Sequence, residues 1–191
     1  MFAALGGLVV YGLWAIDGIT RHDVPGDPEY YVVRQAIFAV VGIAGMAAVV
    51  FIDPDYYRRH RKVVYAVALF LLLVVMAAGA DIRGSTRWID FGFFRFQPSE
   101  FVKLMLALVL AGVLAARTRQ IGDWRTTGVV VGLAAVPTLL VFTQPDIGTA
   151  LVYSAILLAA LFFAGTRWRD LGALALIAGL LATTVLWFAP S

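Results

Sequence analysis

The sequence contains no cysteine, which excludes disulfide bonds, thiolate nucleophiles and cysteine-ligated metal sites. Histidine is almost as scarce: only His22 and His60 occur, and neither has a nearby cluster of ligands, so no metal site is expected. Charged residues make up 14% of the chain, whereas soluble domains carry about 25%. The sequence also has no phosphate-cradling glycine loop, nucleophile elbow or His-Glu metal motif. These absences argue against the known soluble chemistries.

Apolar residues are in excess, at 62% of the chain against roughly 45–50% in soluble domains. They gather into runs of about 16 to 20 residues with hardly any charge, the length that crosses ~30 Å of hydrocarbon as a helix. The first run lacks the basic segment and cleavage site of a signal peptide, so it is also interpreted as a span. We therefore predict an all-α polytopic membrane protein with one transmembrane domain over residues 1–191. About seven spans are expected, near residues 1–20, 35–52, 63–80, 98–116, 126–143, 147–165 and 171–189.

The distribution of basic residues predicts the orientation of these spans. Nine of the 15 Lys and Arg residues lie in the even-numbered connections, and short basic connections stay in the cytoplasm. The N-terminus is then cytoplasmic and the C-terminus extracytoplasmic, so the connection before residue 98 and the break at 144–149 face outwards. The same distribution accounts for the net charge of +3, and no nucleic acid partner is expected. The nine residues are Arg58, Arg59, Arg61, Lys62, Arg117, Arg119, Arg125, Arg167 and Arg169.

The longest connection, residues 83–103, carries two charged residues into an apolar run. Glu100 and Lys103 lie three residues apart, so they share a helix face and can pair. Charge inside a membrane span is costly and marks a functional candidate. Two interpretations are open: Glu100 complements the dipole and backbone of the helix start, or the two residues form a buried pair that shapes an outward-facing cavity. Lys103 favours the second, because from its deeper position it can snorkel outwards only weakly.

Asp146 is the only Asp, Glu, Lys or Arg between Arg125 and Arg167. One interpretation is that it caps the sixth span by accepting hydrogen bonds from the amides of Gly148 or Thr149. The other is an acid at the outer rim of a cleft, beside the end of the long connection. The residue types leave both interpretations open.

Basic and aromatic residues alternate in the long connection. Arg83, Arg87 and Arg95 are interleaved with Trp88 and four phenylalanines. This pattern is typical of an aromatic belt at headgroup depth. The alternative is that the arginines recognise the phosphate of an anionic lipid, for which a guanidinium is well suited.

Two segments carry a resemblance to a known family. Residues 87–103, with the pattern R-W-x-D-x-G-x-x-R-F-Q-P-S-E-x-x-K, resemble the signature of the SEDS family (RodA/FtsW/SpoVE), most nearly that of its RodA members. Residues 143–150, T-Q-P-D-I-G-T-A, resemble the second signature of the family at the expected distance. The first pattern is long and specific, and the resemblance runs over essentially the whole chain.

The resemblance implies a bacterial peptidoglycan glycosyltransferase of the cytoplasmic (inner) membrane. Such proteins polymerise lipid II at the outer face of that membrane during cell-wall elongation and cell-shape maintenance, and a class B penicillin-binding protein is the expected partner. No resident cofactor is evident, although a divalent cation would help to neutralise the leaving pyrophosphate. The residues expected in or near the substrate cavity are Arg87, Trp88, Arg95, Gln97, Glu100, Lys103, Asp146 and Thr149.

The sequence departs from the family in length. The resemblance implies about ten spans and a chain roughly twice as long, with the catalytic aspartate in a large loop after the seventh span. That aspartate would lie beyond residue 191, so no catalytic residue is assigned, and this chain alone is not expected to polymerise glycan. Two alternatives are a lipid II flippase and a membrane scaffold that recruits the penicillin-binding protein. The flippase is disfavoured because charged residues do not continue through the bilayer beyond Lys103.

Overall fold

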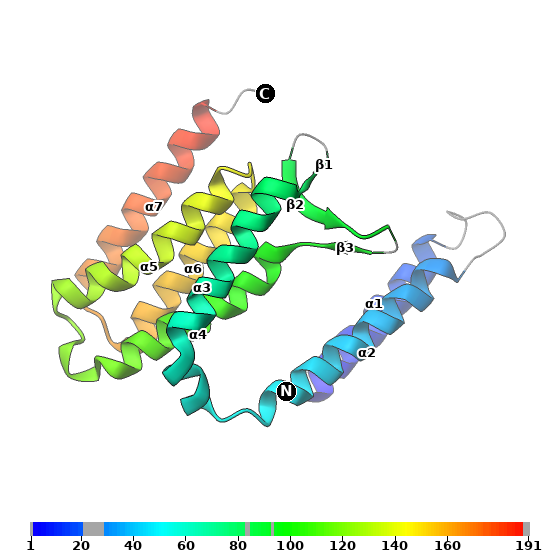
Figure 1. Cartoon of the computed structure of the whole chain (residues 1–191), viewed down its shortest axis with the longest axis horizontal. Helices are drawn as coiled ribbons and strands as arrows, with labels where there is room; N and C mark the ends of the chain where they lie inside the picture. The colour runs from blue at the N-terminus through cyan, green and yellow to red at the C-terminus, as the bar shows by residue number, and fades with distance from the viewer. Residues whose placement is uncertain (1, 21–28, 83–84, 93, 189–191) are drawn as a thin grey trace. The chain divides into compact units, whose positions relative to one another are not determined.

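The computed structural model describes residues 2–20, 29–82, 85–92 and 94–188 (Figure 1). Long helices dominate, which confirms the predicted all-α polytopic class. Within the described residues, five helices, α2 to α6, are long and apolar enough to cross a membrane, and α1 contributes a shorter apolar stretch. The membrane orientation of the termini and the single domain stay predictions. The α-helices are α1 (Phe2–Thr20), α2 (Tyr30–Val50), α3 (Pro54–Ala78), α4 (Pro98–Ala116), α5 (Trp124–Phe142), α6 (Ile147–Ala164) and α7 (Trp168–Phe188).

Several helices begin earlier than hydropathy predicts, and α3 shows why. The basic segment 53–62, interpreted from the sequence as a sharp turn, is helical from Pro54 onwards. Proline suits a first helical position, and Asp55 in the first turn complements the helix dipole. Asp55 also pairs with Arg58 at 3.2 Å, three residues later on the same face. Polar residues at a helix end continue the helix beyond the apolar span, so the prediction of a turn was wrong.

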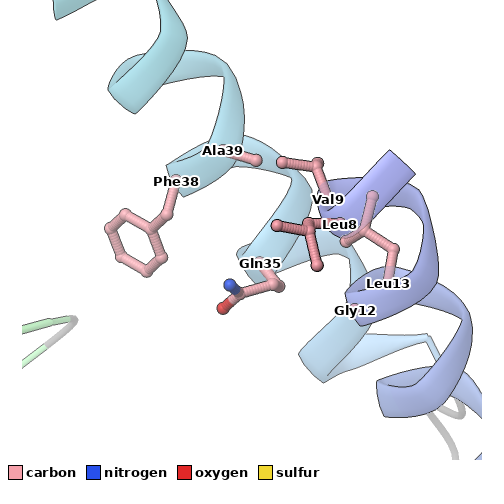
Figure 2. A pocket seen from close by; sticks show the side chains of 7 residues that line it. All are labelled: Leu8, Val9, Gly12, Leu13, Gln35, Phe38 and Ala39. Carbon is pink, nitrogen blue, oxygen red and sulfur yellow. The ribbon is translucent and has the colours of Figure 1, made fainter. Parts of the chain in front are cut away.

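The chain divides into two compact units, and the first is Met1–Asp53. Here α1 and α2 pack against each other, yet no residue of α2 is buried. A pocket of about 350 Å³ lies between the two helices. Figure 2 shows the side chains that line it. It is lined by Leu8, Val9, Gly12 and Leu13 of α1 and by Gln35, Phe38 and Ala39 of α2.

The second unit, Pro54–Ser191, holds the apolar core. α4 is its central helix, since it packs against α3, α5 and α6. Within a membrane these contacts stabilise by close packing rather than by removal of apolar surface from water. The core includes Leu72 of α3, Leu106 and Leu110 of α4, Val130 of α5, and Tyr153 and Leu161 of α6.

The long connection before α4, for which the sequence analysis predicted no secondary structure, folds as a small antiparallel sheet. Its order is β1 (Ala80–Ile82), β2 (Ser85–Asp90) and β3 (Arg95–Phe96). The β2–β3 pairing places Asp90 opposite Arg95. Gly92 lies at the tip with a φ of 81°, which other residues adopt only with strain. Phe91 and Phe94 stack there with ring centroids 5.0 Å apart.

The break between α5 and α6 is held by a buried amide. Gln144 is 2% exposed, and its side-chain nitrogen donates a hydrogen bond at 3.2 Å to the carbonyl oxygen of Leu72 on α3. This bond fixes the break against α3, so the start of α6 has a defined position relative to the core. α6 ends at Ala164, and Gly165 follows it in the left-handed conformation.

Candidate functional site

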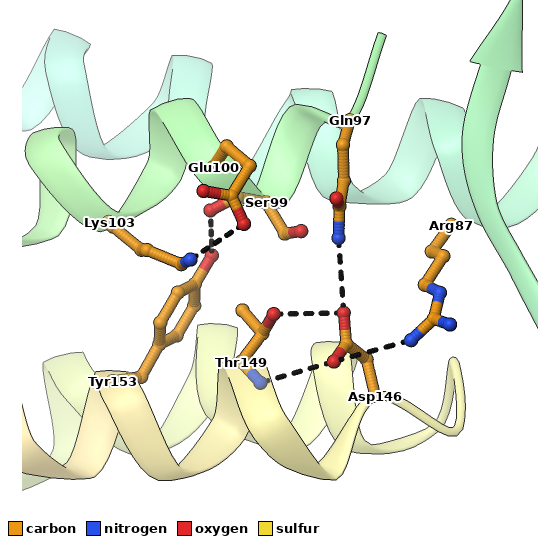
Figure 3. Close-up of polar contacts among 8 residues, drawn as sticks. All are labelled: Arg87, Gln97, Ser99, Glu100, Lys103, Asp146, Thr149 and Tyr153. Atoms are coloured by element: carbon orange, nitrogen blue, oxygen red, sulfur yellow. Dashed lines mark hydrogen bonds and ion pairs between the residues drawn. The ribbon is translucent and has the colours of Figure 1, made fainter. Parts of the chain in front are cut away.

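Three segments of the second unit converge around the polar side chains that the sequence singles out (Figure 3). α4 begins at Pro98, where the missing amide hydrogen costs no helical hydrogen bond. α6 begins directly after Asp146, and β2 contributes Arg87. Because α4 contacts both α6 and β2, the two helix starts and the strand lie together.

Asp146 is the centre of the first polar cluster. Its Oδ1 accepts a hydrogen bond from the amide of Thr149 at 3.1 Å, and its Oδ2 accepts one from the Thr149 hydroxyl at 2.9 Å. The side-chain amide of Gln97 donates to Oδ2 at 3.2 Å, and the Arg87 guanidinium pairs with Oδ1 at 3.5 Å. Asp146 is 6% exposed, so these donors replace water around its charge. The helix-capping interpretation is confirmed, and Asp146 also links α6 to α4 and β2.

Glu100 and Lys103 form the second polar cluster. The Lys103 ammonium lies 2.6 Å from Glu100 Oε1, so the expected pair is formed. The Glu100 side chain is 53% exposed and that of Lys103 23%, so Glu100 is not buried by the described residues. Figure 3 shows the pair beside Tyr153 of α6. The cavity that this pair was expected to shape stays a prediction.

The remaining two candidates, Trp88 and Arg95, lie on the β2–β3 hairpin. Trp88 is half-buried on β2. Arg95 is 60% exposed, and its Nε pairs with Asp90 Oδ2 at 3.3 Å. Of the predicted residues, Arg87, Gln97 and Thr149 therefore contact Asp146. Glu100 pairs with Lys103, and Arg95 pairs with Asp90 within the hairpin.

The Asp90 carboxylate gives this hairpin a predictable pH dependence. A hydrogen bond from the Gly92 amide at 2.8 Å, assisted by Arg95, holds the pKa of Asp90 below its ordinary value of 3.8, although partial desolvation opposes the shift. Because the folded pKa is lowered, this contribution to hairpin stability is present above the ordinary value and is lost as the pH falls through the lowered one. We expect the Gly92 amide resonance to titrate below about pH 4. In Asp90→Asn this titration should disappear; its persistence would assign the effect to another group.

Sequence reasoning did not single out Tyr153 and Ser99. Tyr153 is fully buried, and its hydroxyl donates a hydrogen bond at 3.0 Å to the carbonyl oxygen of Ser99 in the first turn of α4. The Ser99 hydroxyl and the Arg87 Nε are buried, and within the described residues neither has a hydrogen-bond partner. Tyr153 lies seven residues, about two helical turns, after Asp146, which caps α6. That spacing places the two residues on the same side of the helix and was the available signal.

The sequence model of a protein family, the FtsW/RodA/SpoVE cell cycle proteins, matches residues 1–190 of this chain. The chain belongs to the FtsW/RodA/SpoVE family. The resemblance noted from the two signatures is therefore confirmed, and with it a multi-pass protein of the bacterial cytoplasmic membrane.

Individual members of the FtsW/RodA/SpoVE family are similar along the chain. The peptidoglycan glycosyltransferase MrdB of Escherichia coli K12 is 33% identical over 191 residues, covering 98% of this chain and 49% of MrdB. The probable peptidoglycan glycosyltransferase FtsW of Thioalkalivibrio sulfidiphilus is 37% identical over 178 residues, covering 88% of this chain and 43% of that protein. The chain thus spans about half the length of the curated relatives it matches.

Two solved structures share the fold of this family member. The crystal structure of the rod shape determining protein RodA of Thermus thermophilus has a TM-score of 0.67 and 28% identity, covering 89% of this chain and 57% of RodA. A chain from a peptidoglycan synthase complex has the same TM-score and identity, covering 94% of this chain and 53% of its own length.

The two clusters do not fit a divalent cation well. In the described part of the chain, no three His, Asp or Glu side chains gather in a way that would hold a metal ion. The oxygens of Asp146 already take donors from Thr149, Gln97 and Arg87, and Glu100 is joined to Lys103. These contacts leave neither cluster with a pair of free carboxylates for a divalent cation.

Proposed function

We propose that this chain forms the part of a peptidoglycan glycosyltransferase that shapes the lipid II site at the outer face of the cytoplasmic membrane. Membership of the family and the names of its relatives support the reaction class. The observation that carries the proposal is the convergence of Arg87, Gln97 and Thr149 on Asp146, beside the Glu100–Lys103 pair. Maintaining charged side chains at the starts of two apolar helices costs free energy, which is typical of a functional site.

The proposed reaction replaces the undecaprenyl pyrophosphate of a growing glycan by the 4-hydroxyl of the next lipid II. The new glycosidic bond forms as the bond to pyrophosphate breaks, and the hydroxyl proton passes to a general base. Cationic groups stabilise the negative charge that develops on the leaving pyrophosphate. Arg95 suits this role, because its side chain is 60% exposed and the Asp90 carboxylate with which it pairs lies on the same hairpin.

Asp146 suits a positioning role rather than that of the base. Its two oxygens accept three hydrogen bonds and lie next to the Arg87 guanidinium, so both oxygens are already taken up by contacts within the protein. By orienting Gln97 and Arg87, Asp146 would hold the start of α4 and strand β2 in register around the substrate. The general base is not assigned to a described residue.

A class B penicillin-binding protein is the proposed partner. The support is that one structural neighbour is a chain of a peptidoglycan synthase complex described as coordinating polymerization and crosslinking. A glycan polymerase and a cross-linking enzyme act on consecutive states of the same strand, so their association fits the chemistry.

The test is polymerisation of lipid II in liposomes. The chain would be assayed alone and as a chimera that continues with the part of E. coli MrdB that it does not cover. We expect the chimera to form glycan polymer, resolved on a gel. Transbilayer movement of labelled lipid II without polymer would instead support a flippase. A folded chimera that does neither, but retains the penicillin-binding protein, would support a scaffold.

Replacing Arg95 tests its proposed role in the same assay. Arg95→Ala in the chimera is expected to lower lipid II polymerisation by about tenfold, because a cation is lost from the leaving group. The matched control is Asp90→Asn, which removes the hairpin ion pair but keeps the guanidinium. Unchanged turnover in Arg95→Ala would reject the role, and an equal loss in Asp90→Asn would assign the effect to hairpin structure.

A further inference from the structure

The second unit has a groove at the end of α4 and α6 that lies away from the site. Its volume is about 590 Å³, within the roughly 300–1,000 Å³ of ligand pockets. The C-terminal halves of α4 and α6 form its walls, and the short 3-10 helix η1 (Thr118–Gln120) with the following Ile121 closes one end. The lining residues are Ala107, Ala111, Leu114, Ala115, Thr118, Ile121, Ile156, Ala159, Ala160, Phe163 and Ala164.

The walls of this groove are apolar and made largely of alanine. Ala107, Ala111 and Ala115 follow one another at four-residue spacing, so they form a stripe along one face of α4. All three are exposed. Phe163 of α6 stands at the rim with 85% of its surface exposed. Small side chains below a large rim residue leave a channel in which an extended hydrocarbon chain can lie against both helices.

The η1 end of the groove is strongly basic. Arg117 and Arg119 flank Thr118, which lines the groove. Arg167, in the connection before α7, also lies near this end of the groove. A Cβ atom added to Gly122, the residue after Ile121, would lie 3.8 Å from the Arg167 Nε. Within the described residues, no acidic side chain pairs with Arg117, Arg119, Arg167 or Arg169. The nearby Asp123 instead caps α5, where it accepts the Arg125 amide.

We propose that this groove binds an anionic phospholipid, with one acyl chain along the alanine stripe and the phosphate among Arg119 and Arg167. An apolar channel that opens at guanidinium groups matches both halves of such a lipid, and basic pockets between membrane helices are known to suit anionic headgroups. A packed helix would fill the channel but would leave these cations unpaired unless it carried acids. The inference does not rest on the proposed glycosyltransferase function.

Native mass spectrometry of the chain with added lipid tests this proposal. Phosphatidylglycerol would be compared with phosphatidylcholine of identical acyl chains, so the two probes differ only in headgroup charge. We expect one phosphatidylglycerol to bind about tenfold more tightly than phosphatidylcholine. The double variant Arg119→Gln, Arg167→Gln should lose this preference, whereas Ala111→Leu, which fills the channel, should weaken binding of both lipids.

Matched controls separate the groove from general lipid adhesion. Arg59→Gln removes an exposed arginine of α3, and Ala173→Leu enlarges an exposed alanine of α7; neither lines the groove. Both controls should bind lipid as the unchanged chain does. Equal lipid binding in all variants would overturn the proposal. A dimer that dissociates in Ala111→Leu without lipid dependence would overturn it too, because the groove would then hold a second copy. Circular dichroism verifies that each variant is helical. If Ala111→Leu does not fold, the double variant Arg119→Gln, Arg167→Gln still tests whether the groove prefers an anionic lipid.

Discussion

Replacing Asp146 by alanine is expected to lower the free energy of unfolding by about 3 kcal/mol. The change removes the cap of α6, which typically contributes about 1 kcal/mol, and leaves the Arg87 guanidinium without its anion. The Arg87 side chain is 36% exposed, so water compensates part of this loss and the estimate lies at the lower end for broken buried pairs. Denaturant titration followed by circular dichroism measures the change.

Two further variants divide the effect of Asp146 into its parts. Asp146→Asn keeps a good capping side chain but removes the charge, so it should cost less than alanine. Thr149→Val removes the hydroxyl that donates to Oδ2 at 2.9 Å and should cost about 1 kcal/mol. If Asp146→Asn were as stable and as active as the unchanged protein, Asp146 would be a helix cap alone, without a role for its charge.

Breaking the Glu100–Lys103 pair is expected to reduce activity far more than stability. Lys103→Met in the polymerising chimera should lower lipid II turnover by about 100-fold, if the ammonium contacts the anionic substrate. The free energy of unfolding should change by less than about 1 kcal/mol, because Glu100 is half-exposed and such pairs contribute little. Glu100→Gln is expected to follow the same pattern with a smaller loss of turnover, because the cation remains.

The ion pair between Asp55 and Arg58 is the matched control for this prediction. It has the same three-residue spacing at the start of α3, and its charges are separated by 3.2 Å. Asp55→Asn should leave polymerisation unchanged within about twofold. If Glu100→Gln and Lys103→Met were each harmless to folding and to activity, the idea that this pair shapes a substrate cavity would fail.

Local patterns in the sequence predicted much of this molecule. Long apolar runs predicted the membrane helices, because the helix rise and the thickness of the hydrocarbon core together set the number of residues that crosses a bilayer. The Glu100–Lys103 pair followed from a three-residue spacing, and the cap at Asp146 was one of two interpretations of its place before an apolar run. The start of α3 was misjudged for the same local reason, since hydropathy does not detect a helix whose first turns are polar.

Contacts between distant residues were beyond such patterns. The sheet before α4 was not predicted, because its strands are short and mix aromatic with charged residues. Gln97 reaches Asp146 across 49 residues, and Tyr153 reaches Ser99 across 54. Gln144, a polar residue in the break between two predicted spans, is buried and donates a hydrogen bond to α3 across 72 residues.

The stretch from Arg87 to Lys103 shows the division clearly. The sequence alone determined its family and the helical pair at its end, because residue order and helix periodicity are properties of a short segment. Only the tertiary structure decided that Arg87 and Gln97 meet Asp146 while Arg95 stays with Asp90. The physical reason is that these contacts require α4 to pack against α6 and β2 to lie against α4. That packing depends on side chains throughout the core of the second unit.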